Sequence, residues 1–172
     1  VGAARGIGSW MALARTAAYA NALFLTISFG TLAYSFYISD FTLLNVASNS
    51  NSLLPWFYKV AATWGSHEGS ILFWALMLTW WGFLVALTSR KLPQETVARV
   101  LGVMGFITAG FVAFMLFTSN PFLRLFPAAP EGADLNPLLQ DPGMVFHPPL
   151  LYMGYVGFTV PFAFAIAALI AG

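Results

Sequence analysis

The segment Ser70–Thr88 has the sequence SILFWALMLTWWGFLVALT and contains no formally charged residue. A bilayer core of about 30 Å needs about 20 mainly apolar residues in helical form, so this segment is long enough to span a membrane. Three other segments meet the same requirement: Thr16–Ile38, Val97–Thr118 and Leu150–Ala171. A spanning backbone must satisfy its own hydrogen bonds, and the alternation of barrel strands is absent, so we expect four helices. The sequence therefore predicts an all-α integral membrane protein.

The composition of the chain supports this fold class. Hydrophobic residues make up 59% of the sequence and charged residues only 8%, whereas soluble proteins have roughly a quarter charged residues. The net charge of +1 gives no reason to expect nucleic acid as a partner. The absence of cysteine excludes disulfides, thiolate metal sites and a c-type haem attached to this chain.

Both ends of the sequence have the character of a fragment. The chain begins at Val1 without a signal sequence and stops at Gly172 inside an apolar run. We therefore expect residues 1–172 to form a single membrane domain that belongs to a larger polytopic helix bundle.

Basic residues are distributed unevenly over the connections. The N-terminal flank and the short link after the second span carry Arg5, Arg15, Arg90, Lys91 and Arg99. The two longer connections, residues 39–69 and 119–149, carry only Lys59 and Arg124. Short cytoplasmic segments are enriched in Lys and Arg, so we expect the longer connections to be outer loops. Both histidines of the chain, His67 and His147, then lie on the outer side.

The first candidate site is the motif WGSHEGS at Trp64–Ser70, before the second span. Ser66 can cap the following helix, and Glu68 in its first turn would favour the positive end of the helix dipole. A metalloprotease motif needs a second histidine four residues after the first, and position 71 is isoleucine. His67 is therefore either a structural or solvated residue, or a residue that supports a binding site.

The second candidate site is the proline-rich stretch DPGMVFHPP, residues 141–149, before the fourth span. Asp141 followed by Pro142 is typical of a helix N-cap and predicts one short interfacial turn. His147 precedes Pro148, so we expect extended backbone at the histidine. A stiff apolar platform that holds a neutral imidazole suits an axial haem ligand. The alternative on spacing alone is an interfacial histidine beside a helix start.

Two long blocks of this sequence carry a resemblance to a known family. They are NVASNSNSLLPWFYKVAATWGSHEGSILFWALML at residues 45–78 and EGADLNPLLQDPGMVFHPPLLYMGYVGFTVPFAFAIAALI at residues 131–170. Both resemble the cytochrome c maturation protein F (CcmF) family, the haem lyase subunit of the system I pathway. The resemblance covers essentially the whole chain but only the N-terminal portion of the family's protein. It implies a haem lyase (synthetase) subunit of a complex in the bacterial inner membrane, with functional loops facing the periplasm.

The resemblance also implies partners and site residues. The family receives haem from the haem chaperone CcmE and, with CcmH-type subunits, promotes covalent attachment of haem to apocytochrome c outside the membrane. His147 then corresponds to an external axial ligand of the iron in this transient haem. His67, Glu68 and Arg124 are candidate supporting residues, and no catalytic residue is assigned. A second haem, a haem b, would have its ligands outside this chain.

Two other functions are compatible with a membrane protein of this composition. A membrane subunit of a transporter or of a respiratory proton-pumping complex usually has ionisable groups at the membrane midplane, and none of the four spans has one there. This class is kept as the alternative function. A purely structural assembly subunit would predict that replacing His147 affects neither haem content nor cytochrome c yield.

Overall fold

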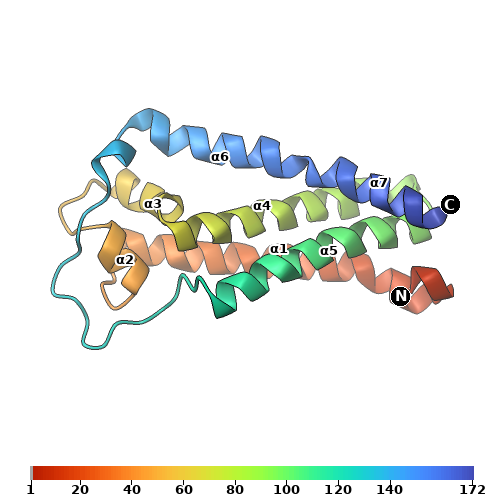
Figure 1. Ribbon diagram of the computed structural model, residues 1–172, viewed down its shortest axis with the longest axis horizontal. Helices are drawn as coiled ribbons and strands as arrows, with labels where there is room; N and C mark the ends of the chain where they lie inside the picture. Colours follow the sequence, from red (N-terminus) through yellow and green to blue (C-terminus); the bar gives the residue numbers. More distant parts are fainter. Residues whose placement is uncertain (1) are drawn as a thin grey trace.

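The computed structural model describes residues 2–172, apart from the side chain of Met144, and these residues form an elongated helical bundle (Figure 1). The long helices are α1 Gly8–Tyr37, α4 His67–Thr88, α5 Gln94–Phe117, α6 Pro142–Gly157 and α7 Thr159–Ala171. Helices α6 and α7 follow one another along a single path, so four helical paths are long and apolar enough to cross a membrane. The expectation of an all-α membrane protein with four transmembrane helices is confirmed.

Short elements occupy the two ends of the bundle. They are η1 Ala3–Arg5, α2 Leu44–Asn49, α3 Trp56–Gly65, η2 Ser89–Lys91 and η3 Pro137–Leu139. Figure 1 shows α2, α3 and both long connections at one end of the bundle, and the two termini at the other end. We call the first of these the loop end. Both histidines lie at the loop end, because His67 begins α4 and His147 lies near the start of α6.

Helix α4 is the central helix of the bundle. Half of its most apolar 18-residue stretch is buried within the chain. The buried share of the corresponding stretch is 11% in α1, 28% in α5 and 17% in the α6–α7 path. Helix α4 contacts α1, α3, α5 and α6, and two hydrophobic clusters lie along it. Leu72 and Ala75 belong to the cluster at the loop end, and Leu78 and Val85 belong to the cluster toward the termini. The other paths keep apolar faces exposed, as expected of helices that contact lipid or further helices.

The helix that begins at Pro142 differs from the sequence expectation. We expected a short turn and extended backbone at His147, and this expectation is wrong, because α6 runs without interruption through His147, Pro148 and Pro149. Proline at both positions removes the amide hydrogen bonds to the carbonyls of residues 144 and 145 and crowds these carbonyls, in the second turn of the helix. The preference for extended backbone before proline is a bias, and the capped helix start overrides it.

The same helical path is broken at Phe158, between α6 and α7. Pro161 has no amide hydrogen for the carbonyl of Gly157, and its ring crowds that carbonyl, so the helix turns there. Trp81 of α4 packs against this point, since a Cβ atom on Gly157 would lie 3.1 Å from the indole. The indole Nε1 also donates to the carbonyl of Met153 at 3.0 Å. These contacts hold α6 against the central helix.

Candidate functional site

A pocket of about 610 Å³ lies at the loop end, between α6 and the corner where α3 passes into α4. We call it the aromatic pocket. The side chains that surround it include Trp64, His67, Trp74, Pro148, Tyr152 and Tyr155. Its volume falls within the range of roughly 300–1,000 Å³ that is usual for small-molecule sites. The pocket brings the first candidate motif together with the helix that carries the second.

The wall of the aromatic pocket is built around Trp74 of α4. The Trp74 ring lies 4.8 Å from the ring of Tyr155 and 5.9 Å from that of Tyr152, in edge-to-face arrangements. Phe111 of α5 stacks on Trp74 with a centroid distance of 5.2 Å. Such aromatic pairs each contribute roughly 0.5–1.5 kcal/mol beyond area burial, so the wall is held in place by several contacts.

The corner before α4 is fixed by a cap and by a glycine. The Ser66 hydroxyl accepts a hydrogen bond of 3.0 Å from Gly69 N, which confirms the predicted N-cap. A Cβ atom on Gly69 would lie 1.7 Å from the carbonyl oxygen of Thr63, so only glycine fits there. This role of Gly69 was not predicted from the sequence, although a glycine in the first turn of an apolar helix is a signal of close backbone approach. The corner places His67 as the first residue of α4.

The imidazole of His67 is held by a residue from another helix end. Its Nδ1 lies 3.0 Å from the hydroxyl oxygen of Ser119, which is buried just after α5. Whichever of the two atoms donates, this hydrogen bond occupies Nδ1 and leaves Nε2 as the second nitrogen. His67 is exposed and lines the aromatic pocket. The His67 side chain therefore has a hydrogen-bond partner in Ser119 and also has access to the aromatic pocket.

His147 lies on the flank of the aromatic pocket. It is exposed on α6, and the next residue, Pro148, lines the pocket. The α6 residues in the pocket wall are Pro148, Leu151, Tyr152 and Tyr155, which share one helix face by their spacing. His147 precedes Leu151 by one turn and is roughly 90° around the helix from the middle of this face. Its imidazole is therefore available to a ligand beside the pocket.

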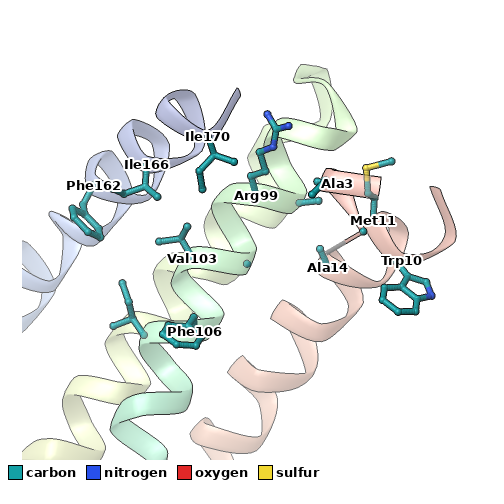
Figure 2. A pocket seen from close by; sticks show the side chains of 15 residues that line it. Ala3, Trp10, Met11, Ala14, Arg99, Val103, Phe106, Phe162, Ile166 and Ile170 are labelled. Atoms are coloured by element: carbon teal, nitrogen blue, oxygen red, sulfur yellow. The ribbon is translucent and has the colours of Figure 1, made fainter. Parts of the chain in front are cut away.

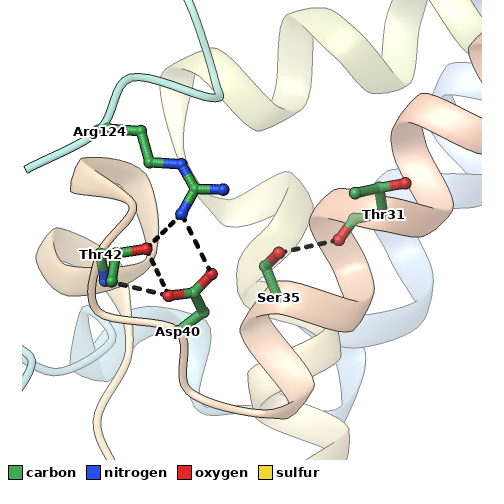
Figure 3. A network of polar contacts seen from close by, with 5 residues as sticks. All are labelled: Thr31, Ser35, Asp40, Thr42 and Arg124. Carbon is green, nitrogen blue, oxygen red and sulfur yellow. Dashed lines mark hydrogen bonds and ion pairs between the residues drawn. The ribbon is translucent and has the colours of Figure 1, made fainter.

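Glu68 and Arg124, the other predicted supporting residues, do not line the aromatic pocket. Glu68 is half-buried in the first turn of α4. Arg124 lies beside α2, where its Nη1 donates to the Thr42 hydroxyl at 2.6 Å and lies 3.8 Å from an oxygen of Asp40 (Figure 3). Asp40 also accepts hydrogen bonds from the amide and hydroxyl of Thr42. This network attaches the long loop before α6 to the connection between α1 and α2.

A second large pocket, of about 740 Å³, lies at the opposite end of the bundle between α1, α5 and α7 (Figure 2). Its walls are mainly apolar and include Phe106 and Phe162. Arg99 lies at its edge and makes an ion pair of 2.5 Å with Glu95 one turn earlier on α5. Neither histidine is near this pocket, since both lie at the loop end.

The donor atoms at the loop end constrain what kind of metal it could hold. Among residues 2–172 no group of three His, Cys, Asp or Glu side chains could hold a metal ion together. A single imidazole fits a metal that is already held by other ligands, as iron is held by the nitrogens of a porphyrin.

Fold and site together define a polytopic α-helical membrane protein with an aromatic pocket and two imidazoles at one end of the bundle. The chain belongs to the cytochrome C assembly protein family, which matches residues 64–171. The family resemblance expected from the sequence is thereby confirmed.

Several relatives match along almost the whole chain. The cytochrome c-type biogenesis protein CcmF of Pseudomonas aeruginosa is 58% identical over 100% of this chain and 26% of that protein. CcmF of Escherichia coli (strain K12) is 56% identical over 99% of this chain and 27% of that protein. The solved structure of a cytochrome c heme lyase CcmF superposes with a TM-score of 0.85 at 28% identity, over 99% of this chain and 26% of that chain. The chain thus spans about a quarter of the length of these relatives.

Proposed function

We propose that this chain forms part of the haem-handling surface of a cytochrome c haem lyase subunit in the bacterial inner membrane. The subunit receives haem from the chaperone CcmE and, with CcmH-type subunits, promotes its attachment to apocytochrome c on the periplasmic face. The names of the relatives support this function, since they are cytochrome c-type biogenesis proteins and a solved haem lyase.

The observation that carries the proposal is the placement of His147. An exposed imidazole on α6, beside a pocket with aromatic walls, is suited to binding the iron of a haem that is passed on rather than kept. In this proposal haem is the substrate and His147 is an axial ligand of its iron. Exposure of the imidazole leaves room for delivery of the haem.

The loop end is assigned to the periplasmic side in this proposal. Both long connections and both histidines lie at this end, whereas η2 with Arg90 and Lys91 lies at the other. An excess of basic residues marks the cytoplasmic side of membrane helices, which supports the assignment. Arg124 then supports the site indirectly, because its contacts to Asp40 and Thr42 anchor the loop that leads to α6.

A maturation assay in cells tests the proposed function. We expect His147→Ala in the full-length protein to insert normally and to lose most of the yield of c-type cytochromes, measured by haem staining. Leu150→Ala is a matched control, because Leu150 is also exposed on α6 and does not line the aromatic pocket. A normal cytochrome c yield with His147→Ala would contradict the proposal and favour a structural role for this chain.

A further inference from the structure

We propose that the aromatic pocket binds the porphyrin ring itself, independently of the iron, and that His67 is the polar contact of the ring in this pocket. The inference rests on the proposed function for the identity of the ligand, haem. It adds a second point of attachment, since His147 holds the metal and the aromatic pocket holds the macrocycle.

The walls of the pocket suit a flat aromatic ligand. Trp74 is braced by Phe111, Tyr152 and Tyr155, so its ring has a defined orientation. Tyr155 is 51% exposed even though it contacts Trp74, which leaves part of its ring free for a ligand. Aromatic faces and edges bind other flat π-systems with little loss of side-chain entropy when they are already ordered.

His67 supplies the polar group at the edge of the pocket. The hydrogen bond between Nδ1 and Ser119 fixes the imidazole from the side of α5. Its Nε2 is then the nitrogen that can meet a ligand in the aromatic pocket. A small number of fixed polar groups in a mainly apolar wall is typical of a site that orients its ligand.

The pocket wall and His147 belong to the same stretch of α6. Pro148 lines the pocket and directly follows His147 in α6, and Leu151 lies one turn beyond it. A ring that leans on Pro148 and Leu151 therefore lies next to the imidazole of His147. This arrangement separates recognition of the macrocycle from ligation of the iron.

Metal-free protoporphyrin IX separates the two contributions, because it has no iron for His147 to bind. Its fluorescence is titrated against the full-length protein in nanodiscs, with Tyr155→Ala compared with Tyr37→Ala. Tyr37 is 53% exposed at the loop end of α1 and lies outside the pocket, so it is a matched control. We expect a loss of about tenfold in porphyrin affinity for Tyr155→Ala, and no change for Tyr37→Ala.

A second variant distinguishes loss of the binding pocket from misfolding of the Tyr155→Ala protein. Ser70→Trp adds bulk to the pocket from the fourth residue of α4 without removing any of its aromatic wall. We expect it to reduce porphyrin affinity as strongly as Tyr155→Ala. Equal affinity of the wild type, Tyr155→Ala and Ser70→Trp would overturn the pocket as a porphyrin site and would indicate partition into the lipid alone.

The role of His67 is tested with glutamine and asparagine, because the side-chain amide of each can take the place of one of the two imidazole nitrogens. Gln at position 67 can place a nitrogen near Nε2, whereas Asn can place one near Nδ1. We expect His67→Gln to retain more porphyrin affinity than His67→Asn or His67→Ala. Wild-type affinity in all three variants would remove His67 from the proposal.

The outcomes also separate this inference from the proposed function. If porphyrin binding depends on Tyr155 while His147→Ala supports normal cytochrome c yield, the proposed ligand role of His147 fails and the pocket remains. If His147→Ala abolishes maturation while Tyr155→Ala and Ser70→Trp leave porphyrin binding unchanged, the pocket fails and the ligand role remains.

Discussion

The Asp141 carboxylate accepts a hydrogen bond of 2.7 Å from Gly143 N, and this bond caps α6 ahead of His147. Pro142 occupies the first helical position, where its fixed φ favours the helix and its missing amide hydrogen costs nothing. The cap and the proline together start a helix that continues through two further prolines. The orientation of His147 therefore depends on a helix start six residues earlier in the chain.

Loss of this cap is expected to loosen the helix that carries His147. Asp141→Ala removes the acceptor for Gly143 N and should cost about 1 kcal/mol, whereas Asp141→Asn keeps an acceptor and should cost little. Amide hydrogen exchange over residues 143–147 measures the effect, and we expect faster exchange in the alanine variant alone. Unchanged exchange in that variant would show that the cap does not hold this turn.

The corner before α4 provides a second prediction, at Gly69. A methyl group at this position collides with the carbonyl of Thr63, so Gly69→Ala must displace the α3–α4 corner. We expect a loss of about 1–3 kcal/mol in unfolding free energy, as for other overpacked sites. The thermal unfolding midpoint in detergent should fall accordingly. Gly82→Ala is the control on the same helix, since its Cβ would meet Met104 at an ordinary distance of 3.9 Å.

A third prediction concerns acid sensitivity of the loop before α6. Both carboxylate oxygens of Glu131 accept hydrogen bonds from Ser52, one from the hydroxyl at 2.6 Å and one from the amide at 3.0 Å. The hydrogen bond from the Ser52 hydroxyl is the largest cause of a lowered pKa for Glu131, followed by the amides of Gly132 and Ser52. A carboxyl group with a lowered pKa stabilises the attached loop above its ordinary pKa of about 4.3, and this contribution is lost as pH falls through the lowered value.

We therefore expect the loop to become more mobile on acidification below about pH 4.3. A spin label on Ala133→Cys, an exposed position in this loop, reports the mobility. Glu131→Gln should make the label mobile at neutral pH and should remove this part of the pH dependence. An acid response of the same size in the Glu131→Gln protein would assign it to another group.

The orientation in the membrane gives a fourth prediction. Leu53 and Ala133 are exposed at the loop end, and Gln94 is exposed at the opposite end. Single cysteines at 53 and 133 should react with a membrane-impermeant thiol reagent in intact cells whose outer membrane has been permeabilised, in a protein without other cysteines. A cysteine at 94 should react only after the inner membrane is opened. The reverse pattern would place both histidines in the cytoplasm.

The sequence predicted those features that depend on local composition. Long apolar segments must become helices in a membrane, and the cap at Ser66 follows from the residues next to it. The family resemblance rested on long continuous blocks, which need no knowledge of the fold. For these reasons the fold class and the start of α4 could be predicted before the structure.

Features that depend on contacts between residues far apart in the sequence could not be predicted in this way. The hydrogen bond between Ser119 and His67 joins two helix ends that are far apart in the sequence. The aromatic pocket likewise needs the positions of α4 and α6 relative to each other. At His147 a local rule was applied correctly but was outweighed, because the cap at Asp141 and the helix beyond Pro149 favour a continuous α6.

The most direct test of the account is rescue of His147→Ala by imidazole. The small ligand can fill the vacated position on the iron without repairing any other contact of the side chain. Haem delivery to apocytochrome c is measured with the purified full-length protein, its partner subunits and haem-loaded chaperone. We expect almost no delivery by His147→Ala and partial recovery when imidazole is added, with no effect of imidazole on Leu150→Ala. Full delivery by His147→Ala without imidazole would contradict the assignment of His147 as the haem ligand.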